Sequence, residues 1–106
     1  MRDRLLSTLG LCRRAGKLIW GFDAVAQAVA ADKARLVLFA RDISPKSAKE
    51  MRYLCEKKKI IPHTAPVTMD EIWFRVGKRA GILAVADQGL SHKITELLSR
   101  MHTEEE

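Results

Sequence analysis

Apolar residues recur along the chain at helical spacing in five segments, and short continuous apolar runs lie between these segments. Leu5, Leu9 and Cys12 share one helical face, so a first helix is predicted over about residues 2–14 and is ended by Gly16. The same spacing predicts four more helices. They extend from Phe22 to about Asp32, from Pro45 to the lysine run 57–59, from Met69 to Gly77, and from just after Asp87 to about Met101.

Three of these helix starts carry capping signals. Ser44 precedes Pro45, which suits an N-cap followed by proline at the first helical position. Thr68 and Glu71 have the spacing of a capping box, and Asp87 suits the N-cap of the last helix.

The runs at residues 36–40 and 82–86 are apolar at every position, which indicates strands buried on both faces, the kind found in parallel sheets. A short run over residues 17–20 and a segment that begins at Ile60 predict two further strands, and Pro62 favours a sheet edge for the latter. Because helices and strands alternate, the predicted fold class is α/β. We expect a three-layer α/β/α sandwich around a mostly parallel or mixed sheet of about four strands.

The length of 106 residues suits one domain, which we place at residues 1–103, followed by an acidic tail at residues 104–106. The chain has 19 Lys and Arg against 13 Asp and Glu, for a formal net charge of +6. Three of the acids belong to the tail, so the domain carries nineteen basic and ten acidic side chains, a net charge of +9. Such an excess favours polyanionic partners, because phosphates are steered toward positive charge.

Cysteine usage and hydropathy bear on the compartment. Cys12 and Cys55 fall among helix-patterned apolar residues, so we expect buried, reduced thiols, and no cysteine pair has metal-ligand spacing. No stretch approaches the roughly 18 consecutive apolar residues of a membrane span. The N-terminal apolar run is interrupted by Ser7 and Thr8, which favours a helix of the mature domain over a signal peptide. We expect a cytoplasmic monomer with no membrane partner.

Groups for catalysis are sparse. The segment from Gly16 to Gly21 lacks the spacing of a Walker loop, and no Ser or Thr follows Lys17 to hold magnesium. Asp42 and Asp87 each follow a buried strand, where ligands of open α/β sheets bind, although helix capping also explains both acids. The three histidines are scattered, and no nucleophile elbow is present. We predict no catalytic residue, no metal and no cofactor.

Basic residues beside glycines are better candidates for a site. They form two clusters, one of Arg13, Arg14 and Lys17 and one of Lys78 and Arg79, and both suit binding to phosphates. Gly21 opens the second helix, whose free backbone N–H groups and positive dipole end attract anions. The lysine run 57–59 is explained by the negative end of its own helix.

Three ordered segments carry a family resemblance. Residues 9–21 (LGLCRRAGKLIWG), 36–45 (LVLFARDISP) and 76–89 (VGKRAGILAVADQG) together resemble the start, the central strand and the last loop and strand of the ribosomal protein L7Ae family. The similarity covers about residues 4–100 and is greatest with the short bacterial members, the YlxQ type. The resemblance implies the α/β/α sandwich and binding to a kink-turn, an RNA helix bent sharply by tandem G·A pairs.

The resemblance also implies which residues meet the RNA. The second helix would read guanine edges with its start and first turn, at Gly21, Phe22, Asp23 and Gln27. The last loop, which consists of Lys78, Arg79, Ala80 and Gly81, would pack on an extruded nucleotide. One acid, Asp42, would help to order the site. Strong binders have Asn, Glu and, one turn later, Lys, where this chain has Asp23, Ala24 and Gln27. Each base-edge hydrogen bond that is missing removes about 1–3 kcal/mol of discrimination. We therefore expect weaker kink-turn selectivity, with electrostatic affinity retained.

The sequence thus predicts a non-catalytic protein that binds structured RNA, recognises a kink-turn or related ribosomal RNA element and is associated with the ribosome or translation. RNA is the expected partner, and ribosomal proteins are a second class of partner. The alternative is a protein-interaction module of a ribosome-associated or RNA-processing complex with only non-specific RNA affinity, for which Trp20, Phe22 and the acidic tail are candidate surfaces. An enzyme is a third hypothesis and rests only on Asp42 and Asp87.

Overall fold

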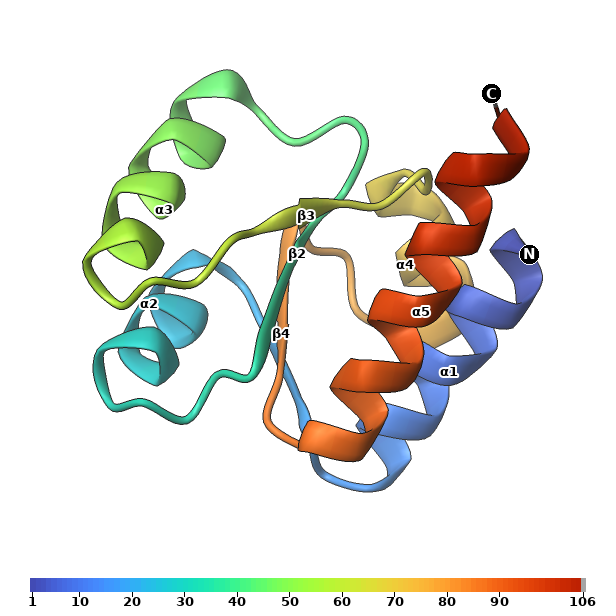
Figure 1. Ribbon diagram of the computed structural model, residues 1–106, viewed down its shortest axis with the longest axis horizontal. Helices are drawn as coiled ribbons and strands as arrows, with labels where there is room; N and C mark the ends of the chain where they lie inside the picture. Colours follow the sequence, from blue (N-terminus) through green and yellow to red (C-terminus); the bar gives the residue numbers. More distant parts are fainter. Residues whose placement is uncertain (106) are drawn as a thin grey trace.

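The computed structural model describes residues 1–105, with side chains for residues 1–101, as alternating helices and strands (Figure 1). The elements are α1 (Arg2–Arg14), β1 (Leu18–Trp20), α2 (Phe22–Ala30), β2 (Leu36–Phe39), α3 (Pro45–Lys57), β3 (His63–Thr64), α4 (Met69–Val76), β4 (Ile82–Val85) and α5 (Gln88–Glu105). The backbone of the predicted acidic tail continues α5 as far as Glu105, whereas the tail's side chains and Glu106 lie outside the described residues.

The strands form one mixed sheet in the order β1-β4-β2-β3. β4 pairs antiparallel with both β1 and β2, and β3 runs parallel to β2. The mixed sheet is as predicted, but within it only β2 and β3 pair in parallel. The apolar runs did not reveal this, because a strand buried on both faces is apolar throughout whichever way its neighbour runs. In consequence β1 and β2 finish where β4 begins. This end of the sheet is here named the Gly21 end.

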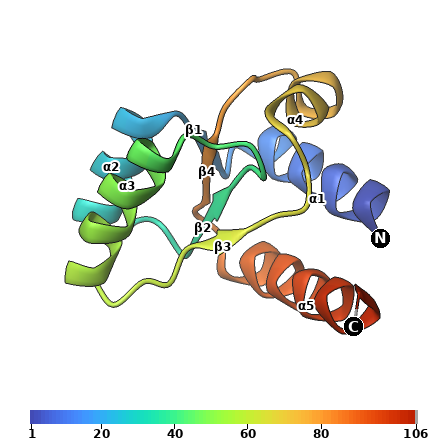
Figure 2. The same ribbon diagram turned by 90° about the horizontal axis from the view of Figure 1, so that it is seen from above.

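The sheet is covered on both faces, which confirms the three-layer sandwich (Figure 2). α2 and α3 lie on one face, and α1, α4 and α5 lie on the other. Alternate side chains of β2 explain its continuous apolar run: Val37 and Phe39 join the core beneath α2 and α3, whereas Leu38 joins the opposite core. Each such fully buried side chain contributes about 1.5–3 kcal/mol.

The predicted helix caps are confirmed. The Ser44 hydroxyl accepts a hydrogen bond from the Ser47 N–H at 3.2 Å, at the start of α3. Thr68 and Glu71 form the reciprocal capping box of α4, at 3.1 and 3.0 Å. The Asp87 carboxylate accepts from the Leu90 N–H at 2.7 Å, in the first turn of α5.

The third strand begins at His63 rather than at the predicted Ile60. The Ile60 N–H donates to the Cys55 carbonyl at 2.9 Å, so this residue closes the end of α3 instead of entering the sheet. Lys59 takes a left-handed φ of 59° in the same turn. β3 lies at the sheet edge, as Pro62 predicted.

Candidate functional site

The start of α2 lies at the Gly21 end of the sheet and has no side-chain cap. Gly21 has a φ of 92°, a region that favours glycine, and its N–H donates to the Ile82 carbonyl at 3.1 Å, which ties the helix start to the start of β4. The next three N–H groups, those of Phe22, Asp23 and Ala24, have no partner within the helix. They form a positive helix end suited to an anion, next to the exposed carboxylate of Asp23.

The segment 77–81, between α4 and β4, is fixed beside this helix start. The Lys78 ammonium lies 5.0 Å from the centroid of the Trp20 ring, at the end of β1. The Gly81 carbonyl accepts from the Ala40 N–H at 2.8 Å, which joins the same segment to the end of β2. The structure thus brings the predicted loop and the predicted helix start together, although they are far apart in the sequence.

Within this segment the predicted residues differ in exposure. Ala80 is buried and Gly81 is half-buried, and a Cβ on Gly81 would meet the Met69 sulfur at 3.3 Å. The Arg79 guanidinium pairs with Asp70 at 3.1 Å, and both side chains are more than half exposed. Such a surface pair contributes only about 0.2–1 kcal/mol. Arg79 is therefore able to exchange Asp70 for a phosphate at little cost.

The first basic cluster is divided by the fold. The Arg13 guanidinium donates to the Val76 carbonyl at the end of α4 and occupies the space that a Cβ on Gly77 would need. Lys17 lies before β1, and its carbonyl accepts from the Ala86 N–H at 2.9 Å, at the opposite end of the sheet from Gly21. The exposed Arg14 guanidinium lies back along α1 beside Gly10. Arg13 therefore supports the segment 77–81, whereas Lys17 stands away from it.

Asp42 and Asp87 do not form a pair. One carboxylate oxygen of Asp42 accepts from the Met69 N–H at 2.9 Å, so it holds the start of α4 against the end of β2. Asp87 caps α5 at the other end of the sheet, because β2 and β4 are antiparallel. The hypothesis that the two acids form one metal or acid–base site is wrong. Within residues 1–101, no group of three or more His, Cys, Asp or Glu could hold a metal ion.

The two thiols are buried and free, as predicted. Burial and the nearby negative charge of Asp87 raise the pKa of Cys12 to about 11. Burial also raises the pKa of Cys55. Both therefore remain protonated and unreactive at neutral pH.

Sequence reasoning missed several residues close to the start of α2. Lys46, Lys49 and Tyr53 of α3 line a groove of about 630 Å³ together with Phe22. Their spacing of three and four residues along one helix face was the available signal. Gln27, a site residue that the family resemblance implies, is exposed one turn beyond Asp23 on α2.

The fold and the site define a class: a small α/β/α sandwich domain in which an uncapped helix start and a basic segment lie side by side at one end of the sheet. Within that class, the chain belongs to the Ribosomal protein L7Ae/L30e/S12e/Gadd45 family, which it matches over residues 3–95. The resemblance noted in the sequence is thus confirmed.

Individual relatives agree with this assignment. The chain is 34% identical to RNA-binding protein YlxQ of Bacillus subtilis (strain 168) over 91 residues, which cover 85% of this chain and 90% of that one. It is 28% identical to RNA-binding protein YlxQ of Enterococcus faecium over 97 residues, with 92% and 93% covered.

Solved structures show the same fold. A protein of unknown function from Bacillus halodurans C superposes with a TM-score of 0.82 at 28% identity, covering 90% of this chain and 96% of that one. The Giardia lamblia 15.5kD RNA binding protein superposes with a TM-score of 0.74 at 16% identity, covering 91% and 85%. None of the helices described here is long and apolar enough to cross a membrane.

Proposed function

We propose that this protein is a non-catalytic binder of structured RNA, that its target is a kink-turn or a related ribosomal RNA element, and that it acts in the cytoplasm in association with the ribosome or translation. Its RNA-binding surface is the Gly21 end of the sheet. RNA is the principal partner, and ribosomal proteins next to the bound RNA form a second class.

One observation carries the proposal: the uncapped start of α2 lies beside the segment that bears Lys78 and Arg79. Backbone N–H groups at a helix start and flanking cations together bind phosphates and orient a protein on RNA. The relatives named RNA-binding proteins support the same ligand class. The net positive charge of the chain supports electrostatic attraction of any nucleic acid.

Selectivity for a kink-turn depends on α2. Asp23 accepts hydrogen bonds from base amino groups, and Gln27 offers an amide to a base edge or a sugar, but neither neutralises a phosphate. Binding is therefore dominated by Lys78, Arg79 and the helix dipole. We therefore expect the protein to prefer a kink-turn over a straight duplex by a small margin.

The test is a titration of a kink-turn RNA and a straight duplex of equal length at several salt concentrations. Lys78→Ala and Arg79→Ala should each weaken binding and flatten the dependence of log K on log salt by about 0.9 for each duplex phosphate that the variant no longer neutralises. Lys17→Ala is the matched control, because it removes the same charge at the opposite end of the sheet. Gln27→Lys should strengthen kink-turn binding.

Two results would contradict the proposal. Equal affinities for both RNAs, with one steep salt dependence, would reject kink-turn recognition and leave a general phosphate binder. An equal decrease in affinity on Lys17→Ala and Lys78→Ala would show that net charge, and not the Gly21 end, determines binding.

A second candidate function, a protein-interaction module, is favoured by a different observation. Trp73 and Phe74 of α4 are 57% and 84% exposed, more than Trp20 at 38%. Exposed aromatic residues of this kind are enriched at protein interfaces. Partners that remain bound after ribonuclease treatment and dissociate on Phe74→Ser would support this function, whereas release of every partner with the RNA would exclude it.

A further inference from the structure

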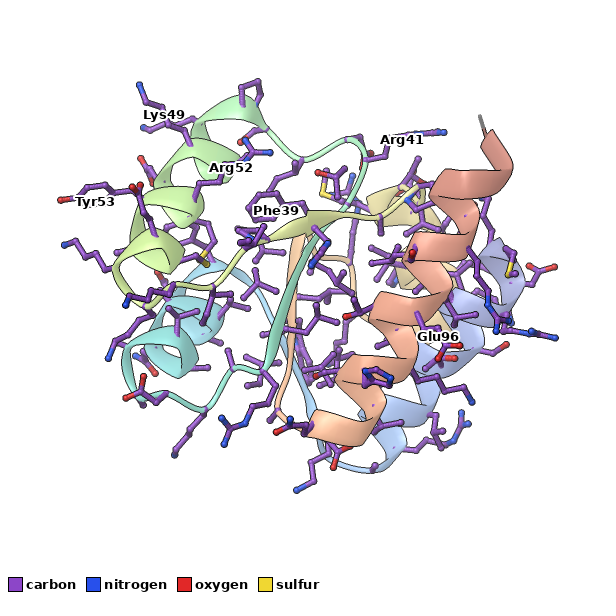
Figure 3. The ribbon with its side chains drawn as sticks, viewed as in Figure 1. Phe39, Arg41, Lys49, Arg52, Tyr53 and Glu96 are labelled. Carbon is purple, nitrogen blue, oxygen red and sulfur yellow. The ribbon has the colours of Figure 1, made fainter. Side chains whose placement is uncertain are left out.

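The groove between the start of α2 and the outer side of α3 continues the proposed RNA surface. Phe22, the first residue of α2, lines one wall, and α3 provides the other, over a volume of about 630 Å³. The groove residues are Phe22, Lys46, Lys49, Glu50, Tyr53 and Leu54. Figure 3 shows Lys49 and Tyr53 projecting from α3 away from the sheet.

Two features of this groove suit a nucleotide. Tyr53 is 61% exposed, which leaves an aromatic ring accessible to a base. Lys46 and Lys49 precede Tyr53 along α3 and line the same groove, and in the part of the chain with described side chains neither takes part in an ion pair. The Lys57 ammonium lies over one face of the Tyr53 ring, 4.5 Å from its centroid, so it adds a third positive charge and leaves the other face for a base.

Among the residues that line the groove, Glu50 is the one acid. The contrast with Arg52 on the same helix is informative. Its guanidinium lies 5.2 Å from the ring centroid of the buried Phe39, so it serves the fold and is turned toward the sheet (Figure 3). Among the residues whose side chains the structure describes, no core residue makes a comparable contact with Lys49 or Tyr53.

We propose that this groove binds a single-stranded RNA segment that extends from the element held at the Gly21 end, with one base stacked on Tyr53 and its phosphates beside Lys46 and Lys49. The inference rests on the proposed function, because Phe22 belongs to both surfaces. Charge complementarity and continuity with the Gly21 end favour RNA over a protein segment.

The experiment compares one kink-turn RNA with and without a short single-stranded uridine extension, placed on each strand in turn. On one of the two strands, the extension should raise affinity for the unmodified protein about tenfold, a gain typical of one base stacking on one aromatic ring. Tyr53→Ala should abolish this gain, and Tyr53→Phe should keep it. Lys49→Gln should lower the salt slope for the extended RNA only, by about 0.7 for one single-strand phosphate.

Phe74→Ala is the matched control, since it truncates an even more exposed aromatic residue on the opposite face of the sheet. No gain from either extension, or an equal decrease in affinity on Tyr53→Ala for both RNAs, would overturn the inference while leaving the proposed function intact. Absence of binding to the unextended RNA would overturn the proposed function. If a single strand alone still bound in a Tyr53-dependent way, the groove would be an RNA site that does not depend on the Gly21 end.

Discussion

Replacing Gly77 with alanine tests whether Arg13 supports the segment 77–81. Gly77 ends α4 with a φ of 88°, and a Cβ at this position would occupy the space held by the Arg13 guanidinium. The substitution therefore has two costs, a strained backbone and a displaced arginine. The second cost exists only if Arg13 holds the Val76 carbonyl.

The magnitudes follow from these interactions. An alanine in the left-handed region costs about 1–2 kcal/mol, and the more restricted unfolded chain returns about 0.5 kcal/mol. A partly buried hydrogen bond from a guanidinium, such as that of Arg13 to Val76, is worth about 1.5 kcal/mol. The free energy of unfolding should thus fall by about 2–3 kcal/mol in Gly77→Ala and by about 1.5 kcal/mol in Arg13→Ala.

A double-mutant cycle separates the two costs. Urea unfolding is followed by far-ultraviolet circular dichroism for the protein, both single variants and the double variant. In the Arg13→Ala background, Gly77→Ala should cost only about 1 kcal/mol, a coupling of about 1.5 kcal/mol. If Gly77→Ala lowers the free energy of unfolding by the same amount in both backgrounds, the Arg13 guanidinium does not occupy the space beside Gly77, and the reasoning is refuted.

Three further predictions concern pH, thiol chemistry and the site. The hydrogen bond from the Thr68 N–H lowers the pKa of Glu71 below its ordinary value of 4.5. The carboxylate of Glu71 therefore contributes fully to stability above pH 4.5, and this contribution is lost as the pH falls through the lowered pKa. The difference in unfolding free energy between the protein and Glu71→Gln should shrink on acidification, and a constant difference would refute this. Because burial raises the pKa of Cys12 to about 11, iodoacetamide should modify this thiol only on unfolding, and fast labelling of the folded protein would disagree. Trp20→Ala should free Lys78 and reduce RNA affinity without unfolding the domain; unchanged affinity would mean that the ring does not position the loop.

Part of the candidate site was predictable from the sequence. The sequence predicts Gly21 because a glycine that opens a helix leaves the backbone N–H groups accessible, and it predicts Lys78 and Arg79 because both are cations beside glycines. Local pattern cannot show that these segments touch, because their proximity depends on the Gly21 N–H bonding to Ile82 and on Lys78 lying over Trp20.

Strand direction accounts for the expectations that the structure corrected. A fully buried strand is apolar on both faces in either orientation, so the runs at residues 36–40 and 82–86 carried no information about their relative direction. The antiparallel pairing of β2 with β4 places Asp42 and Asp87 at opposite ends of the sheet. The same topology places Lys17 away from Gly21.

The sequence by itself determined the elements of this protein and their layering, since apolar periodicity, capping residues and turn glycines act through neighbours a few positions apart. Only the tertiary structure decided which loops share one end of the sheet and which charged side chains are already engaged. Arg13 illustrates the difference: its charge is visible in the sequence, but its hydrogen bond to the end of α4 joins residues that are sixty-three positions apart. Interactions over that separation are set by strand order and helix packing, which no local pattern encodes.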